Sequence, residues 1–370
     1  MTVTVLVEGL RDEVPGAGPL TALLADPLVS DVLVNGPHVW VDRGAGLVRA
    51  GVPVGTPEDV RRLAQRLVAA AGRRLDDGAP FADARLPDGT RLHAVLPPIA
   101  VDGPYLSLRT FRPRAFTLNE LVAVGAVSAG GAGILAGIVA ARLAYLVTGG
   151  TGAGKTTVLA TLLGLVPRDE RIVLVEDAAE LRPAHPHAVA LQARTSNVEG
   201  AGEVGLRALV RQALRMRPDR LVIGECRGAE VIDLLGALNT GHEGGAGTLH
   251  ANNPADVPAR LEALGLLGGV PRAALHAQLA AALQVVVHLS RTATRERVVD
   301  QVCLLLPDAR RELVVAVPAW HRTDGPGPAA TALARLLHQR GVPVPAALGG
   351  APGSPAPGGR SVAPSLGGRP

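Results

Sequence analysis

The sequence is poor in aromatic residues and cysteine, and it contains a single lysine. Aromatic side chains make up 2% of the 370 residues, which argues against the aromatic platforms on which single-stranded nucleic acids stack. Cys226 and Cys303 are the only cysteines, which excludes a disulfide framework and a four-cysteine zinc site. We expect the protein to reside in a reducing cytoplasm. The N-terminus shows no basic region followed by an apolar core, so we expect no signal peptide.

Arginine carries nearly all of the positive charge. Of the 37 basic residues 36 are arginines, and the formal net charge is only +4, so we expect no direct nucleic-acid contact. Residues 121–141 carry no charge, but five of these 21 residues are glycine and only eight are Leu, Ile or Val. Because glycine and alanine gain little from lipid, this stretch predicts a buried helix leading into a strand rather than a membrane span.

Residues 1–113 predict a mixed α/β domain. Short β-rich runs separated by glycine turns fill residues 29–51. Thr56 is a typical helix N-cap, with Pro57 at the first helical position and apolar residues at helical spacing after it. The pair Asp88-Gly89 lies between two alternating runs and predicts a hairpin.

From Leu143 onward, apolar strands alternate with helices. Strands are predicted at 143–149, 171–177 and 220–226, and one of the intervening helices covers residues 205–218. This alternation favours a mostly parallel sheet covered by helices on both faces.

We therefore divide the chain into four parts. An N-terminal domain (1–113) is followed by a linker (114–125) that leads into a helix, and the α/β domain covers residues 126–340. Half of the 30 residues from 341 to 370 are glycine or proline, so we predict a disordered tail there.

The single lysine lies in a glycine-rich loop, "GGTGAGKTT", between a predicted strand and a predicted helix. Gly149, Gly154, Lys155 and Thr156 match the phosphate-loop pattern G-x-x-x-x-G-K-[ST]. A compact ammonium fits inside a loop wrapped around phosphates better than a planar guanidinium does, which explains the lysine, and the Thr156 hydroxyl can reach Mg²⁺. The predicted nucleotide-binding residues are Gly149, Gly150, Thr151, Gly152, Ala153, Gly154, Lys155, Thr156 and Thr157.

Acidic residues end two of the predicted strands. Glu176 and Asp177 end one, and Glu225 ends another. In a parallel sheet, ligands bind beyond the carboxyl ends of the strands, where acids can hold Mg²⁺ or polarise an attacking water. A solvated helix cap is the alternative for any one of these acids, and Glu225 is the strongest candidate for a functional role.

The segment "NTGHEGGAGTLHANNP" carries His242 and His250 in a glycine-rich loop. The H-E-x-x-H zinc pattern fails because Ala246 stands at the second histidine position. Such a loop could sense the γ-phosphate, and a surface histidine is the alternative; the residues alone do not decide between them.

Arginines cluster at two places. Arg207, Arg211 and Arg215 share one face of a predicted helix, and they form a solvated stripe, a subunit interface or a γ-phosphate contact. Arg109 and Arg112 end the N-terminal domain, where they could close over a nucleotide and stabilise transition-state charge.

Four ordered segments resemble the type II/type IV secretion ATPases. Residues 149–157, 175–181, 209–228 and 240–264 resemble, in that order, the Walker A, Asp box, Walker B and His box of this superfamily. Upstream, "VNGPHVWVDR", "DARLPDGTRLHAVLPP" and "LSLRTF" resemble the N-terminal domain of its Tad/CpaF-like branch, which includes VirB-type relatives. The likeness covers roughly residues 20–310.

The resemblance implies a RecA-like P-loop ATPase domain after a smaller α/β domain, in a homohexamer at the inner face of the cytoplasmic membrane. It implies ATP and Mg²⁺ as ligands and inner-membrane pilus or secretion platform proteins as partners. By motif position, the implied catalytic residues are Glu225, Glu176, Arg109 and His250. The resemblance also implies that Arg85 and Arg112 bind nucleotide and that Thr156 and Asp177 hold the metal. Cys226 departs from the branch, which usually has a β-branched residue there.

The leading hypothesis is an ATP-hydrolysing hexameric motor for Tad-type pilus assembly, or for type II/IV secretion including conjugal transfer. Two alternatives belong to other classes. A RecA-like DNA-dependent ATPase predicts hydrolysis stimulated by DNA, and a nucleotide-controlled scaffold predicts ATP binding without turnover.

Overall fold

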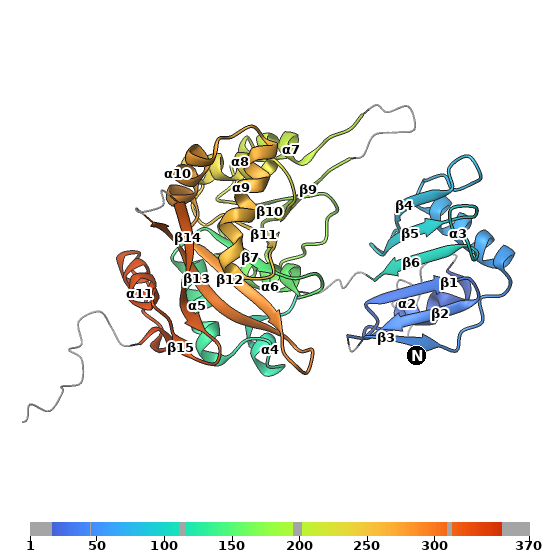
Figure 1. Cartoon of the computed structure of the whole chain (residues 1–370), viewed down its shortest axis with the longest axis horizontal. Coiled ribbons are helices and arrows are strands. Elements are labelled where there is room, and N and C mark those ends of the chain that lie inside the picture. The colour runs from blue at the N-terminus through green and yellow to red at the C-terminus, as the bar shows by residue number, and fades with distance from the viewer. Residues whose placement is uncertain (1–16, 45, 111–114, 195–201, 309–312, 350–370) are drawn as a thin grey trace, which may run out of the picture. The chain divides into compact units, whose positions relative to one another are not determined.

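The computed structural model describes residues 17–44, 46–110, 115–194, 202–308 and 313–349. Contacts between backbone positions divide the chain into two units, Met1–Pro113 and Arg114–Pro370, which are coloured along the chain in Figure 1. Each unit is described by itself.

The first unit is a six-stranded antiparallel sheet with the order β3-β2-β1-β6-β5-β4. Its strands are β1 (Asp31–Asn35), β2 (His38–Asp42), β3 (Leu47–Ala50), β4 (Phe81–Arg85), β5 (Arg91–Val95) and β6 (Tyr105–Arg109). Its helices are η1 (Gly18–Leu20), α2 (Thr21–Ala25) and α3 (Pro57–Ala70). Buried and less buried residues alternate along β1 and β6, so one face of the sheet packs on the helices in a single core.

Two sequence predictions in this unit are confirmed. Thr56 caps α3 in a reciprocal capping box with Asp59, which satisfies backbone N–H groups that the first helical turn leaves free. Strands β4 and β5 pair as an antiparallel hairpin, and the amide of Gly89 donates to the carbonyl of Leu86 in its turn.

The second unit is built on a nine-stranded sheet with the order β15-β14-β13-β12-β7-β11-β10-β8-β9. Strands β12, β7, β11, β10, β8 and β9 are mutually parallel, and β13 to β15 extend the sheet as antiparallel strands. The strands are β7 (Tyr145–Gly149), β8 (Ile172–Glu176), β9 (Ala188–Gln192), β10 (Arg220–Cys226), β11 (Ala246–His250), β12 (Val285–Arg291), β13 (Arg297–Asp308), β14 (Leu313–His321) and β15 (Gly325–Pro326).

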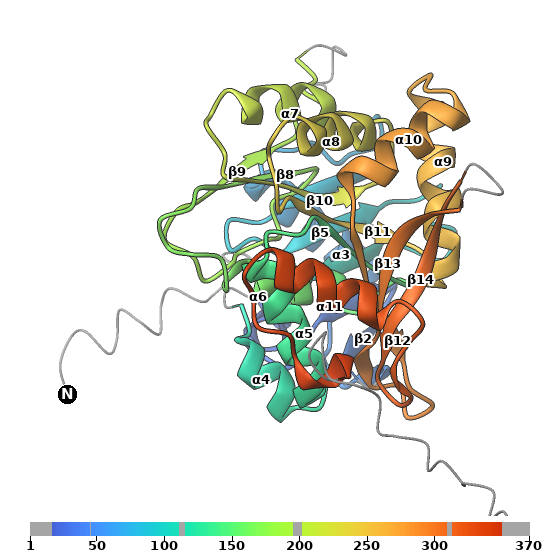
Figure 2. The ribbon, with the colours of Figure 1, turned by 90° about the vertical axis from the view of Figure 1, so that its left-hand side faces the viewer.

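Helices cover both faces of this sheet, as predicted (Figure 2). One face carries α4 (Leu118–Ala123), α5 (Ala129–Ala140), α6 (Lys155–Leu163), α11 (Ala330–Gln339) and η3 (Ala346–Leu348). The other carries α7 (Leu206–Leu214), α8 (Glu230–Asn239), α9 (Val257–Leu267) and α10 (Arg272–Ala282), and η2 (Pro254–Asp256) precedes α9.

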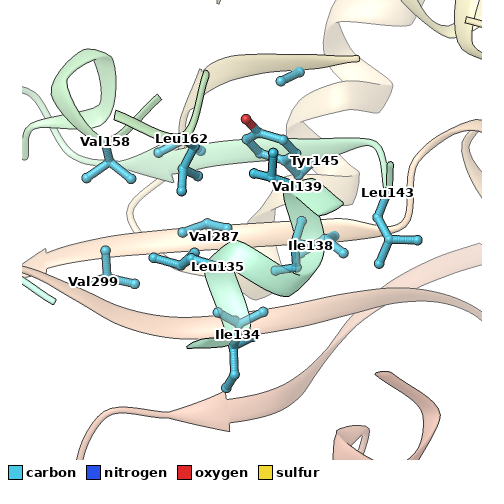
Figure 3. Close-up of a cluster of buried hydrophobic side chains, with 14 of the residues drawn as sticks. Ile134, Leu135, Ile138, Val139, Leu143, Tyr145, Val158, Leu162, Val287 and Val299 are labelled. Carbon is cyan, nitrogen blue, oxygen red and sulfur yellow. The ribbon is translucent and has the colours of Figure 1, made fainter. Parts of the chain in front are cut away.

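Within the uncharged stretch 121–141, residues 121–123 end α4, and α5 is the buried helix that leads into strand β7. Helix α5 packs Leu135 and Val139 in one core cluster with Val287 of β12 and Tyr145 of β7 (Figure 3). Burying these side chains against the sheet supplies the stabilisation that a lipid phase would otherwise provide. In the described part of the chain, no helix combines the length and the apolar composition that crossing a membrane requires.

Two segments differ from their predicted role. The segment predicted as a linker contains α4, whose Leu121 is buried in the core of the second unit. The predicted disordered tail begins too early, because residues 341–349 end in η3 and bury Leu348 beside α5 and α11. Val342, Val344 and Ala347 also pack against this core, so the apolar residues between the glycines and prolines hold the segment in place, which composition alone did not reveal. Residues 350–370 lie outside the described ranges.

Candidate active site

The parallel strands bring the predicted polar residues to one edge of the sheet. Glu176 is the last residue of β8, Glu225 is the second-last residue of β10, and His250 is the last residue of β11. His250 pairs in register with Gly149 at the end of β7. Segments far apart in the chain therefore meet beside the glycine-rich loop, because the carboxyl ends of parallel strands lie at the same edge.

The loop from Gly149 to Gly154 is shaped by close backbone approach. Gly149 has φ +146°, and a Cβ atom there would lie 2.6 Å from the carbonyl oxygen of Leu289 on β12, so only glycine fits. Gly154, with φ +95°, is the N-cap of α6. Helix α6 thus begins at Lys155 with its first amides free, and such an N-terminus attracts anions.

Lys155 is buried, with 8% of its surface exposed. Its ammonium donates to the carbonyls of Gly149 and Gly150, each at 3.0 Å, and lies 3.3 Å from Nδ1 of His250. Burial lowers the pKa of Lys155, and the nearby carboxylate of Glu225 opposes that shift. The lysine is held inside the loop by weak acceptors that a phosphate can replace.

His250 lies between a cation and an anion. An ammonium can only donate, so Nδ1 of His250 accepts from Lys155 and the proton of the neutral ring lies on Nε2. Nε2 is 2.8 Å from Oε1 of Glu225. Burial and then the charge of Lys155 lower the pKa of His250, which favours the neutral ring. Lysine, histidine and glutamate form one continuous chain of contacts.

A β-bulge sets the direction of Glu225. Along β10 the pairing with β11 shifts by one residue between Ile223 and Cys226, which re-aims side chains at that point. The hydroxyl of Thr248 on β11 donates to the Gly224 carbonyl at 2.7 Å and so holds the bulge. Oε1 of Glu225 is buried without an aligned hydrogen bond from any described residue, although Nε2 of His250 is close.

The turn after Glu225 is fixed by two residues that sequence analysis missed. Arg227 pairs with Oε2 of Glu225. Glu230, which is 6% exposed, accepts the backbone N–H groups of Arg227 at 2.6 Å and Gly228 at 2.7 Å. Both residues lie within five positions of Glu225, and this short spacing was the available signal in the sequence. It indicates a contact only when the chain turns back after Glu225 into α8.

Glu176 lies beneath the bulge. Its Oε1 accepts from the amides of Glu180 at 2.9 Å and Leu181 at 3.0 Å, while its Oε2 is buried with no hydrogen-bond partner among the described residues. Burial raises the pKa of Glu176. A Cβ atom at position 224 would lie 2.5 Å from Cγ of Glu176, so Gly224 provides the space for this side chain.

The residues predicted to hold Mg²⁺ lie at the same edge. Thr156 is half-buried in the first turn of α6, and the exposed Asp177 follows directly after β8. Hydroxyl and carboxylate oxygens are ligands that Mg²⁺ accepts. The buried Oε2 of Glu176, which has no hydrogen-bond partner among the described residues, suits the waters that this ion usually retains. The donor set therefore fits Mg²⁺, and the assignment of ligands stays a prediction.

In the first unit, Arg85 and Arg109 belong to a row of three arginines. Arg91 on β5 pairs in register with Arg85 on β4 and with Arg109 on β6. Like charges directly opposite on neighbouring strands are unfavourable, and Asp31 compensates one of them through a 3.0 Å contact with Nε of Arg109. Sequence analysis missed Arg91, because the register between strands, which the sequence does not show, decides which residues lie beside it. Arg112 lies outside the described residues.

Three of the remaining polar residues singled out in the sequence have local partners. Arg207 contacts Asp233 of α8 at 2.6 Å, and Arg211 lies 3.7 Å from the same carboxylate. His242 places Nδ1 3.2 Å from the carbonyl of Ala237 at the end of α8. Thr157 is exposed beside the loop. The two contacts with Asp233 join α7 to α8.

Comparison with solved structures shows the same fold. The pilus retraction motor PilT with bound ADP has a TM-score of 0.55 at 20% identity, with 79% of this chain and 83% of that chain covered. The second unit is a RecA-like P-loop domain, and a smaller mixed α/β domain precedes it.

Comparison with known sequences identifies the family. The family model described as type II/IV secretion system protein matches residues 13–314, and the chain belongs to this family. A putative conjugal transfer protein of Mycobacterium tuberculosis is 57% identical over 338 residues, which cover 90% of this chain and 96% of that protein. The conjugal transfer protein TrbB of Rhizobium radiobacter is 33% identical over 266 residues, with 70% and 78% covered.

Proposed function

We propose that this protein is a Mg²⁺-dependent ATPase that works as a homohexameric motor of a pilus-assembly or secretion system. The observation that carries the proposal is the contact chain from Lys155 through His250 to Glu225 at the mouth of the phosphate loop. Membership of the secretion family supports the assignment. The Tad-type pilus branch is the finer proposal, and conjugal transfer, after which the relatives are named, is its nearest rival.

Binding begins with an exchange of partners at Lys155. The two loop carbonyls and His250 that now receive its hydrogen bonds are weaker acceptors than phosphate oxygens, because charged acceptors form stronger hydrogen bonds. A triphosphate therefore draws the ammonium toward its β and γ oxygens, and the amides that begin α6 bind the same group. Mg²⁺, when held by Thr156 and Asp177, would neutralise phosphate charge.

Lysine moving to the phosphates frees His250. Its Nδ1 then loses the hydrogen bond from Lys155 while Nε2 remains beside Glu225, so the histidine links the state of the ligand to the position of the carboxylate. Glu225 orients and polarises the attacking water and accepts that water's proton. Glu176 supplies a second buried carboxylate oxygen behind the same water site.

The arginine row of the first unit is proposed to approach the nucleotide. Arg85, Arg91 and Arg109 lie side by side on three strands, and an anion relieves the repulsion within such a row. Arginine can also stabilise the charge that builds up during phosphoryl transfer. We further propose a position at the inner face of the cytoplasmic membrane, where membrane platform proteins of the machine bind the ring.

The test is turnover of MgATP by the purified full chain. Lys155→Ala is expected to abolish nucleotide binding, whereas Glu225→Gln is expected to bind MgATP and lower turnover by about a hundredfold or more. Light scattering with nucleotide measures the oligomeric state. Unchanged turnover in either variant would refute the assigned roles, and binding without turnover in the wild type would favour the scaffold alternative.

A further inference from the structure

The hairpin that joins β12 to β13 carries a concentration of positive charge. Arg291, Arg295 and Arg297 lie within seven residues, with Glu296 as the only acid among them. Arg291 and Arg297 are direct partners in the antiparallel register, and both are exposed. Two like charges opposite each other repel, and an anion bound between them would reduce that repulsion.

The same arginine pair touches the phosphate loop. Nη2 of Arg291 donates to the carbonyl oxygen of Gly152 at 3.1 Å. A Cβ atom at Gly154 would lie 3.9 Å from Cδ of Arg297, so the stem of that side chain runs past the end of the loop. Strand β12 lies on the opposite side of β7 from β11 and β10. These arginines therefore reach the loop from the side opposite Glu225.

A pocket of about 210 Å³ opens between the end of β12 and the loop. Its lining consists of Gly150, Thr151 and Ala153 from the loop, Asn252 after β11, and His288, Leu289, Ser290 and Arg291 from β12. The space is well above the roughly 10–15 Å³ that one water molecule needs. Hydroxyl, amide and guanidinium groups line it, and no carboxylate does.

His288 forms the floor of the pocket. It is 4% exposed, and its Nδ1 lies 2.9 Å from the hydroxyl of Thr148 on the neighbouring strand. Burial lowers its pKa, which favours the neutral ring. His288 and Thr148 therefore place neutral hydrogen-bonding groups at the bottom of the pocket, and Arg291 lies at its opening. This arrangement suits an anion that enters from the loop side and is held mainly by the guanidinium.

We propose that Arg291, with Arg297 across the hairpin, forms a phosphate-binding subsite over this pocket, beside the phosphate loop. The proposal rests on the proposed nucleotide function. A phosphate group can reach the subsite from two sources: the terminal phosphate of a bound triphosphate, or the inorganic phosphate released when that triphosphate is cleaved. In this proposal, the hydrogen bond from Arg291 to the Gly152 carbonyl forms when no phosphate is bound, and a bound phosphate replaces it.

The experiment titrates sodium phosphate into the full chain by calorimetry. Arg291→Ala is compared with Arg295→Ala, a matched variant on the same hairpin whose residue does not line the pocket. Loss of a charge-assisted hydrogen bond predicts at least about tenfold weaker phosphate binding in Arg291→Ala, with Arg295→Ala unchanged. Arg291→Lys, which keeps the charge, is expected to restore part of the affinity, and thermal melting checks that each variant folds.

MgATP and MgADP titrations then separate the two sources. If the subsite holds the terminal phosphate, Arg291→Ala weakens MgATP binding more than MgADP binding. If it holds released phosphate, MgATP affinity is unchanged and product inhibition by phosphate is relieved. Equal behaviour of Arg291→Ala and Arg295→Ala in every titration overturns the proposal. A wild type that binds no nucleotide overturns the proposed function, while the phosphate titration still decides the subsite.

Discussion

Replacing Gly224 by alanine is expected to displace Glu176, a carboxylate proposed to be catalytic, without emptying the proposed nucleotide site. The new Cβ would lie 2.5 Å from Cγ, 3.0 Å from Oε1 and 3.2 Å from Cδ of Glu176. Carbon atoms in contact are normally about 3.5–4.0 Å apart, so the overlap with Cγ is about 1 Å. Glu176 has little room to yield, because it is 4% exposed and its Oε1 receives two backbone amides.

Either response to this overlap has a cost. If the bulge shifts, the strain of overpacking is about 1–3 kcal/mol. If the Glu176 side chain swings away, its hydrogen bonds to the amides are lost, and bonds to a charged group contribute about 1.5–3 kcal/mol each. A displacement of about 1 Å at a reacting group lowers turnover about a hundredfold. MgATP affinity should change far less, since the lysine-bearing loop follows another strand, β7.

Three measurements on the purified chain test this reasoning: urea unfolding, MgATP calorimetry and steady-state ATP turnover. Gly236→Ala is the matched control, because Gly236 is an exposed residue of α8 whose Cβ would meet nothing within 4 Å, and it should leave turnover unchanged. Adding Glu176→Ala to Gly224→Ala should recover stability but not turnover. A Gly224→Ala chain with wild-type stability and turnover would show that the bulge and Glu176 are not coupled in this way.

Three further changes probe other contacts. Thr248→Val removes the bond to the Gly224 carbonyl, so it should cost about 1–3 kcal/mol in urea unfolding and lower kcat more than it raises KM for ATP, with Thr248→Ser restoring both. Glu230→Ala removes the acceptor of two half-buried backbone N–H groups and should lower kcat strongly. Glu230→Gln, whose amide oxygen still accepts, should keep part of kcat; equal kcat in both variants would contradict a positioning role. In the first unit, hydrogen bonds from Thr56 lower the pKa of Asp59 from 3.8 to about 2, so its stabilising effect is present above about pH 4 and is lost as the pH falls toward 2. Thermal melts across this range should therefore depend less on pH for Asp59→Asn than for the wild type.

The elements that sequence analysis predicted well are those whose signals are local. Thr56 and Asp59 are three residues apart, so the start of α3 follows from hydrogen bonds within a single turn. The glycine loop is equally local, because its shape and the helix that follows depend on adjacent residues. Strand β9 (Ala188–Gln192) was not predicted, since its residues are only partly buried and their apolar pattern is weak.

The site was harder to predict because its partners come from separate strands. Sequence analysis placed Glu225 at the end of an apolar strand but placed His250 in a glycine-rich loop. The structure corrects the second prediction, because His250 is the last residue of strand β11. Their 2.8 Å contact, and the position of His250 against Lys155, depend on the order β7-β11-β10. A different strand order would have kept every motif and separated these groups.

The sequence by itself determined the family, the phosphate loop and the reason for its single lysine, because these depend on residue types at short spacings. The tertiary structure alone decided the bulge that aims Glu225, the space at Gly224 that Glu176 fills, and the pairing of Arg291 with Arg297. Such features depend on register between strands that are distant in the chain. Register is set by how whole layers pack, and no local stretch of residues encodes it.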